Sequence, residues 1–247
     1  MITLRADFHI HTLLSPCGDL GMSPRNILAM ARAKHLDVIG ITDHNSTKQA
    51  LLIQEMGKEA GIFVMCGAEI TTKEEIHCLA FMPDPQRLAL LQEYINDYLP
   101  NFPNDTNRFG YQVAVDRDEN IVYEAPYLLI NGLDQSLEEV SAFVRKTGGL
   151  FIPAHVNRAK FSIISQLGFV PPDLDADALE ISRHITPEEL FRQFSYLSKW
   201  NILRDSDAHL PEDIGRVYNL LEVKGVHFDE IVLAIRCQEG RKTQVAG

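Results

Sequence analysis

The sequence has few of the features typical of secreted and membrane-spanning proteins. It contains four cysteines and one tryptophan in 247 residues, and the cysteines are too unevenly spaced for a disulfide scaffold or a zinc knuckle. Its longest strongly apolar stretches, such as residues 149–156, fall far short of the roughly 18 residues that span a bilayer. Residues 1–7 lack the basic start and apolar run of a secretory signal. The sequence therefore predicts a cytoplasmic protein with reduced thiols and no membrane partner.

Positive charge is also scarce. The chain has 23 Lys and Arg against 34 Asp and Glu, a formal net charge of −11, and no run of basic residues exceeds two. This balance argues against a protein that coats duplex nucleic acid, but it allows a phosphorylated substrate held by bound cations. The sequence also lacks the glycine-rich motifs of P-loop NTPases, dinucleotide-binding enzymes and serine hydrolases.

Short β-rich segments alternate with helical ones along much of the chain. The expected strands lie at residues 2–9, 38–41, 63–70, 150–155, 178–181 and 202–206. The first expected helices lie at residues 23–34 and 47–60. This order is typical of parallel strands joined by crossover helices. With the hairpin described below, the seven or eight candidate strands fit one closed α/β barrel better than two open sheets.

The stretch from about residue 85 to residue 147 departs from this rhythm. It contains an expected helix at residues 86–98, a Pro/Asn-rich break, an expected hairpin at residues 112–124 and a helix at residues 136–147. We interpret it as an α+β subdomain inserted into one domain that spans residues 1–247.

Six of the nine histidines stand where an expected strand ends. They are His9, His11, His44, His77, His155 and His209. Because the carboxyl ends of parallel barrel strands meet on one face, we expect these imidazoles to lie together. Two residues apart on a strand, His9 and His11 point to the same side and can hold one metal ion, and Asp207 and His209 share this spacing. Glu69 closes an apolar strand, where a carboxylate needs a partner such as a cation.

These residues resemble the motifs of the polymerase and histidinol phosphatase (PHP) family. The resemblance rests on Asp-x-His-x-His at residues 7–11, Thr-Asp-His at residues 42–44, Gly-Ala-Glu at residues 67–69, His77, His155 and Asp-x-His at residues 207–209. It covers about residues 1–82 and 150–215. It implies a distorted (β/α)7 barrel, here with the inserted α+β subdomain, and two or three divalent metal ions, for which imidazole and carboxylate ligands suit Zn, Mn or Fe.

The resemblance also implies which residues bind each ion. The ligands are His9, His11, Glu69 and Asp207 for the first ion, Glu69, His77 and His155 for the second, and His44, His209 and Asp19 for the third. At the position of Asp19, other family members carry His, Asp or Glu. Asp7 and Asp43 adjoin ligands, and we expect them to orient those ligands.

The implied activity is that of a phosphoesterase. A hydroxide that bridges two ions would attack a phosphomonoester or a small nucleotide-type substrate, with Glu69, Asp207 and His209 as the catalytic residues. Positive side chains at the ends of expected strands would bind the phosphate. The candidates for this role are Arg158, Arg183 and His184.

Two other functions remain compatible with the sequence. The first is a 5′-directed exonuclease on short single-stranded nucleic acid, which would need a cationic groove with stacking aromatic residues. The second is a non-catalytic, metal-stabilised module that binds a partner, for which missing ligands are the expected sign. The motifs specify neither the substrate nor the oligomeric state.

Overall fold

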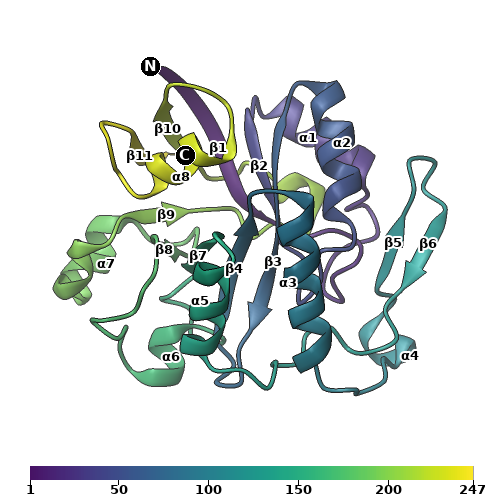
Figure 1. Cartoon of the computed structure of the whole chain (residues 1–247). Coiled ribbons are helices and arrows are strands. Elements are labelled where there is room, and N and C mark those ends of the chain that lie inside the picture. Colours follow the sequence, from purple (N-terminus) through teal and green to yellow (C-terminus); the bar gives the residue numbers. More distant parts are fainter. Residues whose placement is uncertain (247) are drawn as a thin grey trace.

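A curled β-sheet forms the centre of the fold (Figure 1). The computed structural model describes residues 1–246. The strands are β1 (Ile2–Ile10), β2 (Val38–Ile41), β3 (Phe63–Thr71), β4 (His77–Met82), β5 (Val113–Val115), β6 (Ile121–Glu124), β7 (Leu150–Pro153), β8 (Leu179–Ile181), β9 (Ile202–Arg204), β10 (Tyr218–Val223) and β11 (Lys242–Ala246). The helices are α1 (Pro24–Ala33), α2 (Ala50–Ala60), α3 (Pro85–Tyr98), α4 (Thr106–Phe109), α5 (Leu137–Lys146), α6 (Ile163–Leu167), α7 (Pro187–Gln193), α8 (Phe228–Ile235) and the 3₁₀ turns η1 (Ser195–Lys199) and η2 (Pro211–Asp213). Among these residues, no helix is long and apolar enough to cross a bilayer.

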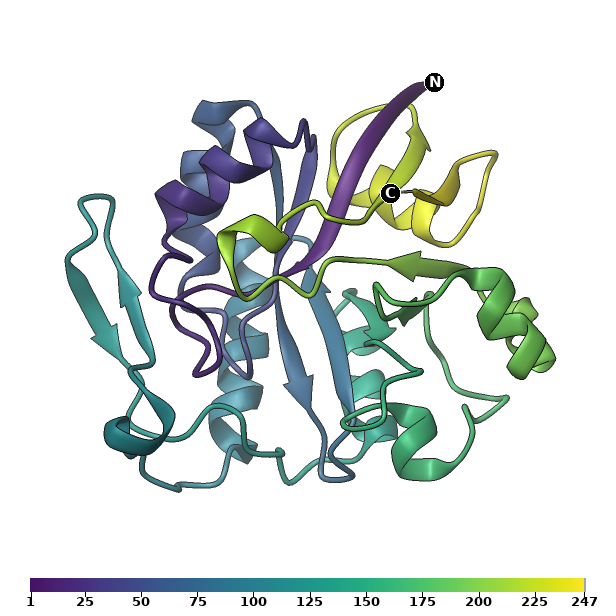
Figure 2. The same ribbon diagram turned by 180° about the vertical axis from the view of Figure 1, so that it is seen from behind.

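The barrel wall is built from β1, β2, β3, β4, β7, β8 and β9. The first five strands lie in this order in one hydrogen-bonded sheet, and β8 pairs in parallel with β9. Isolated hydrogen bonds join the two parts: Asp177 N donates to Phe151 O (2.9 Å), and Ala208 N donates to His9 O (3.0 Å). Figure 2 shows from behind how the chain beyond β9 passes the end of β1. The expected distorted (β/α)7 barrel is therefore confirmed, and its distortion lies in this incomplete closure.

The strand that carries His77 runs in the opposite direction to the one expected. β4 pairs antiparallel with both β3 and β7, because the short connection at residues 72–76 forms a hairpin and has no room for a crossover helix. His77 therefore begins a strand and does not end one. Since the strand is reversed, its first residue still lies at the edge where β3 ends, with His77 opposite Thr71.

Two strands near the carboxyl end extend the sheet beyond the barrel. β10 pairs antiparallel with the first half of β1, from Ile2 opposite Val223 to Ala6 opposite Asn219, and β11 pairs with β10. The helix α8 packs against both β10 and β11, so that this unit stands beside the barrel (Figure 1). The alternation of strands and helices in the sequence did not predict it.

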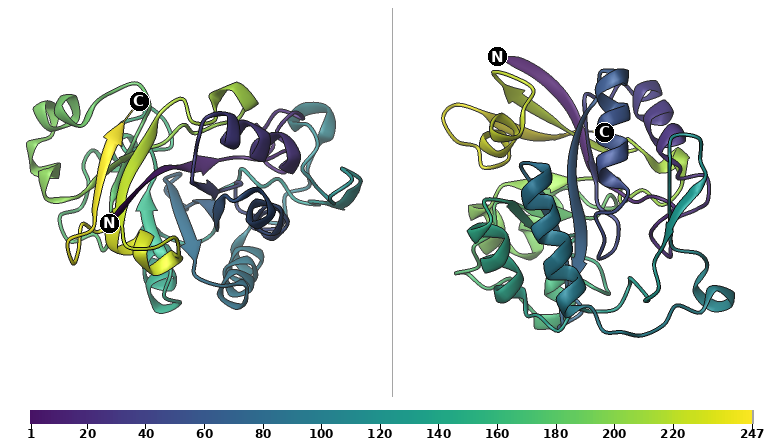
Figure 3. Two further views of the ribbon diagram at one scale, coloured as in Figure 1. Left: turned by 90° about the horizontal axis from the view of Figure 1, so that it is seen from above. Right: turned by 45° about the vertical axis from the view of Figure 1, so that its right-hand side comes forward.

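Alternate residues of the barrel strands pack on opposite faces of the sheet, as the two-residue period of a strand requires. The interior is filled by one set, which includes Ala6, Phe8, Met65, Leu79, Phe81 and Ile152. The outer face, between sheet and helices, holds the other set, which includes Ile39, Cys66, Ala68, Cys78, Ala80 and Phe151. The helices α1 and α2 cover β2 and β3, while α3 and α5 cover β4 and β7 (Figure 3, left).

The segment at residues 85–147 has two different environments. Its terminal helices α3 and α5 pack on the main sheet, where Leu88 and Val144 belong to the outer core. Between them, the hairpin β5–β6 stands to one side (Figure 3, right). It is held by the Gln49 side chain, which hydrogen-bonds to both the N–H and the carbonyl of Val115 (2.8 and 3.1 Å). A separate subdomain at residues 85–147 stays a prediction, and the part that stands apart from the sheet lies between α3 and α5.

Gly67 lies where β3 approaches β4 too closely for a side chain. A Cβ there would stand 2.2 Å from Ala80 O, so Gly67→Ala must push two paired backbones apart. We expect this variant to lose about 3 kcal/mol of unfolding free energy, measured by urea denaturation. Gly61→Ala serves as the comparison: no atom lies within 4 Å of its Cβ, and its φ of +74° makes the cost only about 1 kcal/mol. Equal losses in the two variants would contradict the packing argument.

Candidate metal centre

Six imidazoles meet at one edge of the barrel, as the sequence predicts. Five of them form a closed circle in which neighbouring ring centroids lie 4.7–5.8 Å apart, in the order His9, His11, His44, His77, His155. His209 stacks on His11 with centroids 4.1 Å apart. Residues from both halves of the chain therefore form one cluster.

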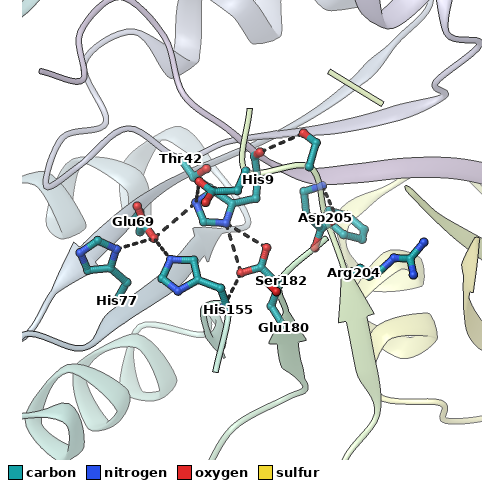
Figure 4. Close-up of polar contacts among 12 residues, drawn as sticks. His9, Thr42, Glu69, His77, His155, Glu180, Ser182, Arg204 and Asp205 are labelled. Carbon is teal, nitrogen blue, oxygen red and sulfur yellow. Dashed lines mark hydrogen bonds and ion pairs between the residues drawn. The ribbon is translucent and has the colours of Figure 1, made fainter. Parts of the chain in front are cut away.

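The Glu69 carboxylate lies at the centre of this circle and is 1% exposed. Its Oε1 stands 2.9 Å from His77 Nδ1, 3.0 Å from His155 Nε2 and 3.4 Å from His9 Nε2, and its Oε2 stands 3.1 Å from His44 Nδ1 and 3.4 Å from His11 Nε2. Figure 4 shows Glu69 between His77, His155 and His9. Five imidazoles thus share one carboxylate.

An extra residue in β1 directs its two histidines toward this carboxylate. Asp7 is opposite Ile39 and Ile10 is opposite Ile41, so β1 has one residue more than β2 between these pairs. Such a bulge changes the side on which the following residues point. Phe8 packs in the barrel interior, and beyond the bulge His9 faces the interior as well. The His-x-His spacing pairs the two rings, and the bulge directs the pair.

Several residues at the cluster have backbone angles that are rare outside glycine. Asn45, His155 and Asp207 have φ values of 43°, 30° and 50°. Each follows a barrel strand where the chain turns sharply. Such strain is maintained only where surrounding contacts enforce it, and it concentrates at functional sites.

Buried carboxylates and hydroxyls hold the imidazoles in place. His9 Nδ1 donates to Glu180 Oε1 at 2.9 Å, and the same carboxylate accepts the His155 N–H at 2.8 Å (Figure 4). On the other side, Ser15 Oγ stands 3.0 Å from His11 Nδ1 and donates to Asp43 Oδ1 at 2.7 Å. Partners of this kind fix the tautomer and orientation of histidine ligands.

The sequence assigned no role to Glu180 or Ser15, and it placed Asp7 and Asp43 beside the ligands. Asp43 acts through Ser15, as described above. Asp7 accepts the backbone N–H groups of Ser206 (3.0 Å) and Gly215 (2.8 Å) and thereby fixes the segment that leads to Asp207. The only sequence signal for Glu180 is a carboxylate directly after the apolar strand residue Leu179.

Burial and charge together set the protonation of the cluster. Desolvation lowers the pKa of His11 to about 3 and also lowers the pKa of His44. Desolvation alone would raise the pKa of Glu69, but the surrounding imidazoles outweigh it and hold that pKa well below its usual value. The pKa of His9 is raised, because the carboxylates of Glu180, Glu69 and Asp207 together exceed the opposing effect of desolvation. An ionised Glu69 beside neutral His11 and His44 is the state that binds a cation.

The donor set fits divalent cations. The groups whose ligand atoms lie within 4.8 Å of one another are His9–His11–Glu69, His44–Glu69–His77 and His11–Cys17–His44–His209. Within the described residues, the buried atoms His77 Nε2 and His155 Nδ1 have no hydrogen-bond partner, and an unpartnered buried polar group costs about 1–3 kcal/mol. Bound cations would give these imidazole nitrogens and the neighbouring carboxylates a partner.

Asp207 and Asp19 have different positions relative to the cluster. Asp207 Oδ1 lies 3.5 Å from the Nε2 atoms of both His9 and His11. The Asp19 carboxylate instead accepts the Gly21 N–H at 2.7 Å within its own turn, and Asp19 belongs to none of the three groups found among residues 1–246. Cys17, to which the sequence assigned no role, lies beside His44 and His209 in place of the expected Asp19.

The three expected phosphate-binding residues differ in their exposure and in their contacts with the cluster. Arg158 Nη1 donates to Asp207 Oδ2 at 2.6 Å, and its side chain is 47% exposed. Arg183 is held by Asp213 Oδ2 (3.1 Å) and Ser206 O (3.2 Å). His184 is exposed and makes no polar contact with the cluster in the part of the chain that the structure describes. Arg158 therefore lies nearest to the candidate ligands.

Glu180→Gln tests the orienting contacts. The amide keeps the volume of the side chain but cannot accept hydrogen bonds at both positions from His9 Nδ1 and His155 N. Because losing such a partner typically costs about 10–100-fold in metal affinity, we expect a loss in this range with unchanged circular dichroism. Isothermal titration with Zn²⁺ measures it, and Glu188→Gln on the exposed face of α7 is the control. An unchanged Zn²⁺ affinity in Glu180→Gln would show that Glu180 does not orient the metal ligands.

Comparison with protein families agrees with the fold. The PHP domain profile matches residues 7–140, more than half of the chain, and a PHP-associated profile matches residues 199–239. The chain belongs to the PHP domain family. The first match contains four of the six clustered histidines, and the second includes His209 together with β9, β10 and α8.

Individual proteins are similar to the chain at low identity, one by sequence and three by structure. The chain is 26% identical to the uncharacterized protein YqxK of Bacillus subtilis over 98% of this chain and 64% of that protein. The lesion-specific endonuclease EndoQ of Pyrococcus furiosus superposes with a TM-score of 0.73 at 21% identity over 98% of this chain and 58% of that one. Endonuclease Q bound to a 27-mer duplex with an abasic lesion at its active site gives a TM-score of 0.67 at 20% identity, over the same shares of the two chains. A Bifidobacterium adolescentis protein, provisionally assigned as a metal-dependent phosphoesterase, gives 0.57 at 22% identity over 83% and 88% of the two chains. The chain thus spans less than two thirds of YqxK and EndoQ.

Proposed function

We propose that the protein is a metal-dependent phosphoesterase. The observation that carries the proposal is the Glu69 carboxylate at the centre of five imidazoles. In this proposal two or three divalent ions, Zn, Mn or Fe, are held by His9, His11, His44, Glu69, His77, His155, Asp207 and His209. Bound ions of this kind supply Lewis acidity and lower the pKa of water. The side chains of this protein would hold the ions, keep the ligating imidazoles oriented and neutralise the charge of the substrate phosphate.

Glu69 is proposed as the shared ligand, because both of its oxygens face imidazole nitrogens. Glu180 keeps His9 Nε2 directed at the centre by accepting from Nδ1. Ser15, held by Asp43, does the same for His11. These contacts fix the donors before substrate arrives, so that no reorganisation is needed during reaction.

Arg158 is proposed to bind the substrate phosphate at the rim. Its contact with Asp207 places the guanidinium beside the candidate ligands, while half of the side chain stays open to solvent. Arg183 and Arg158 follow β8 and β7, and the two loops are joined by Asn157 and Ser182, whose side chain and backbone groups exchange hydrogen bonds of 2.9 and 2.8 Å. Asp207 and His209 stand at the same rim, where a proton can be exchanged with solvent.

The Arg158 role predicts a specific kinetic change. A charge-assisted hydrogen bond contributes about 1.5–3 kcal/mol, so Arg158→Ala should raise KM for a phosphomonoester by about 10-fold or more. Arg192→Ala, an exposed arginine of α7, is the matched control. If both variants keep the wild-type KM, Arg158 does not contact the phosphate.

The test of the proposed function is a substrate panel with a chelator control. The purified chain is loaded with Zn²⁺, Mn²⁺ or Fe²⁺ in turn and given p-nitrophenyl phosphate, bis-p-nitrophenyl phosphate and phosphorylated metabolites. We expect chelator-sensitive hydrolysis, faster on the monoester than on the diester. No turnover with any metal would overturn the proposal and favour the partner-binding module.

A second candidate substrate is a nucleic-acid phosphodiester. It is favoured by the similarity to EndoQ over 98% of this chain, since EndoQ is a lesion-specific endonuclease. The panel therefore includes a duplex with an abasic site, an undamaged duplex and a single-stranded oligonucleotide. Preferential cleavage at the lesion would replace the small substrate with DNA, and trimming from the 5′ end of the single strand would indicate the exonuclease.

A further inference from the structure

Cys17 lies in a group of four donors, of which only His11 belongs to the first two expected ligand sets. The Sγ of Cys17 and one ring nitrogen each of His11, His44 and His209 all lie within 4.8 Å of one another. These residues come from the loops after β1, β2 and β9. The ring of His11 stands between those of His44 and His209, with centroid distances of 4.7 and 4.1 Å.

The loop after β1 brings Cys17, and not Asp19, to this group. Ser15 N donates to Thr12 O (3.1 Å) and Gly18 N donates to Ser15 O (2.9 Å), so residues 12–18 form a tight double turn. A Cβ on Gly18 would lie 2.2 Å from Thr12 O, which explains the glycine after Cys17. The loop is then fixed to the opposite side of the group because Asp19 N donates to His209 O (3.0 Å).

One oxygen of the Asp19 carboxylate is used within its own turn. Its Oδ1 accepts the Gly21 N–H at 2.7 Å, an arrangement that stabilises a turn without any cation. Meanwhile His44 is 3% exposed, and its Nδ1 lies 3.1 Å from Glu69 Oε2 without forming a hydrogen bond within the described residues. His44 therefore belongs to two donor groups, one that contains Glu69 and one that contains Cys17.

Three imidazoles and one thiol form a donor set typical of zinc. Zn–N and Zn–S bonds of about 2.0–2.1 and 2.3 Å in a tetrahedron bring donor atoms closer than 4.8 Å, so small side-chain movements suffice to close the site. A thiolate among the ligands favours Zn²⁺ over Mg²⁺ or Mn²⁺, which prefer oxygen.

We propose that Cys17 provides a thiolate ligand to a divalent cation held with His44 and His209, with His11 beside them, and that Asp19 only shapes the loop. When the S–metal bond forms, the thiol proton passes to solvent and no electron is transferred. The inference rests on the proposed function only in that the cluster binds cations. The proposed thiolate ligand makes the position of the third ion a site suited to Zn²⁺ within the metal centre.

Cobalt substitution tests the proposal without depending on catalysis. The full chain is stripped with a chelator, loaded with Co²⁺ and examined in the near ultraviolet, where a thiolate bound to Co²⁺ gives a charge-transfer band. We expect the band in the wild type, in Cys237→Ser and in Asp19→Asn, and its loss in Cys17→Ser. Losing a direct ligand should also weaken Zn²⁺ at this position by more than the roughly 100-fold that an outer partner costs.

Cys17→Asp guards against a folding defect. A carboxylate at this position should keep the metal and lose the band. A wild type that binds Co²⁺ without the band, or a band that survives in Cys17→Ser, would overturn the proposal. Loss of bound metal in Asp19→Asn with retention in Cys17→Ser would return the ligand role to Asp19. A band in a protein that hydrolyses no phosphoester would instead reject the proposed function and keep the thiolate ligand.

Discussion

Glu69→Gln should abolish phosphoester turnover while the chain stays folded. Glu69 belongs to two of the three donor groups, and an amide offers neither the negative charge nor two ligand oxygens. Since metal ions contribute several kcal/mol to such reactions, the expected loss in kcat/KM is on the order of 10³-fold or more. Elemental analysis of the same preparation should show fewer bound ions for each chain.

The control for Glu69→Gln is Glu93→Gln, an exposed glutamate of α3. It removes the same charge from the surface and should leave both turnover and metal content unchanged. Circular dichroism checks that both variants are folded. Wild-type turnover in Glu69→Gln would show that the central carboxylate is not the shared ligand, and the proposed mechanism would fail.

Removing metal should cost the protein both activity and thermal stability. A ligand present at about 1,000 times its Kd stabilises the folded state by about 4 kcal/mol. For a chain of this size each kcal/mol shifts Tm by roughly 2–4 °C, so chelation should lower Tm by about 10 °C. Differential scanning calorimetry with and without chelator measures the shift, and readdition of Zn²⁺ or Mn²⁺ should restore Tm and turnover together.

The same experiment separates an enzyme from a metal-stabilised module. A module would show the Tm shift and no turnover on the panel. In Glu69→Gln the shift should shrink, because two donor groups are lost. An identical Tm with and without chelator in the wild type would mean that the imidazoles hold no ion.

Much of the site can be predicted from the sequence. Histidines at strand ends, and pairs two residues apart, indicated a common pocket, because strand geometry places such residues on one face. This prediction held even for His77, whose strand runs opposite to the expected direction. Its success there depended on the hairpin between β3 and β4, which returns the chain to the same edge.

Other parts of the site depend on contacts between distant segments. Glu180 contacts His9 across 171 residues of sequence, and no local pattern marks that pairing. The contrast between Cys17 and Asp19 depends on how a seven-residue turn is folded against His209. The path of the loop after β1 is set by hydrogen bonds, and the spacing of residues in the sequence does not predict them.

By itself the sequence determined that this chain forms an α/β barrel and which imidazoles and carboxylates it presents at one edge. Strand periodicity and motif order carry that information because both are local. The tertiary structure alone decided the reversed strand β4, the bulge that directs His9 and His11, the added strands β10 and β11, and the placing of Cys17 among the histidines. The bulge, the added strands and the contact of the Cys17 loop with His209 follow from backbone hydrogen bonds between segments far apart in the chain, and their energies exist only once the barrel is assembled. The direction of β4 follows from the short hairpin that joins it to β3.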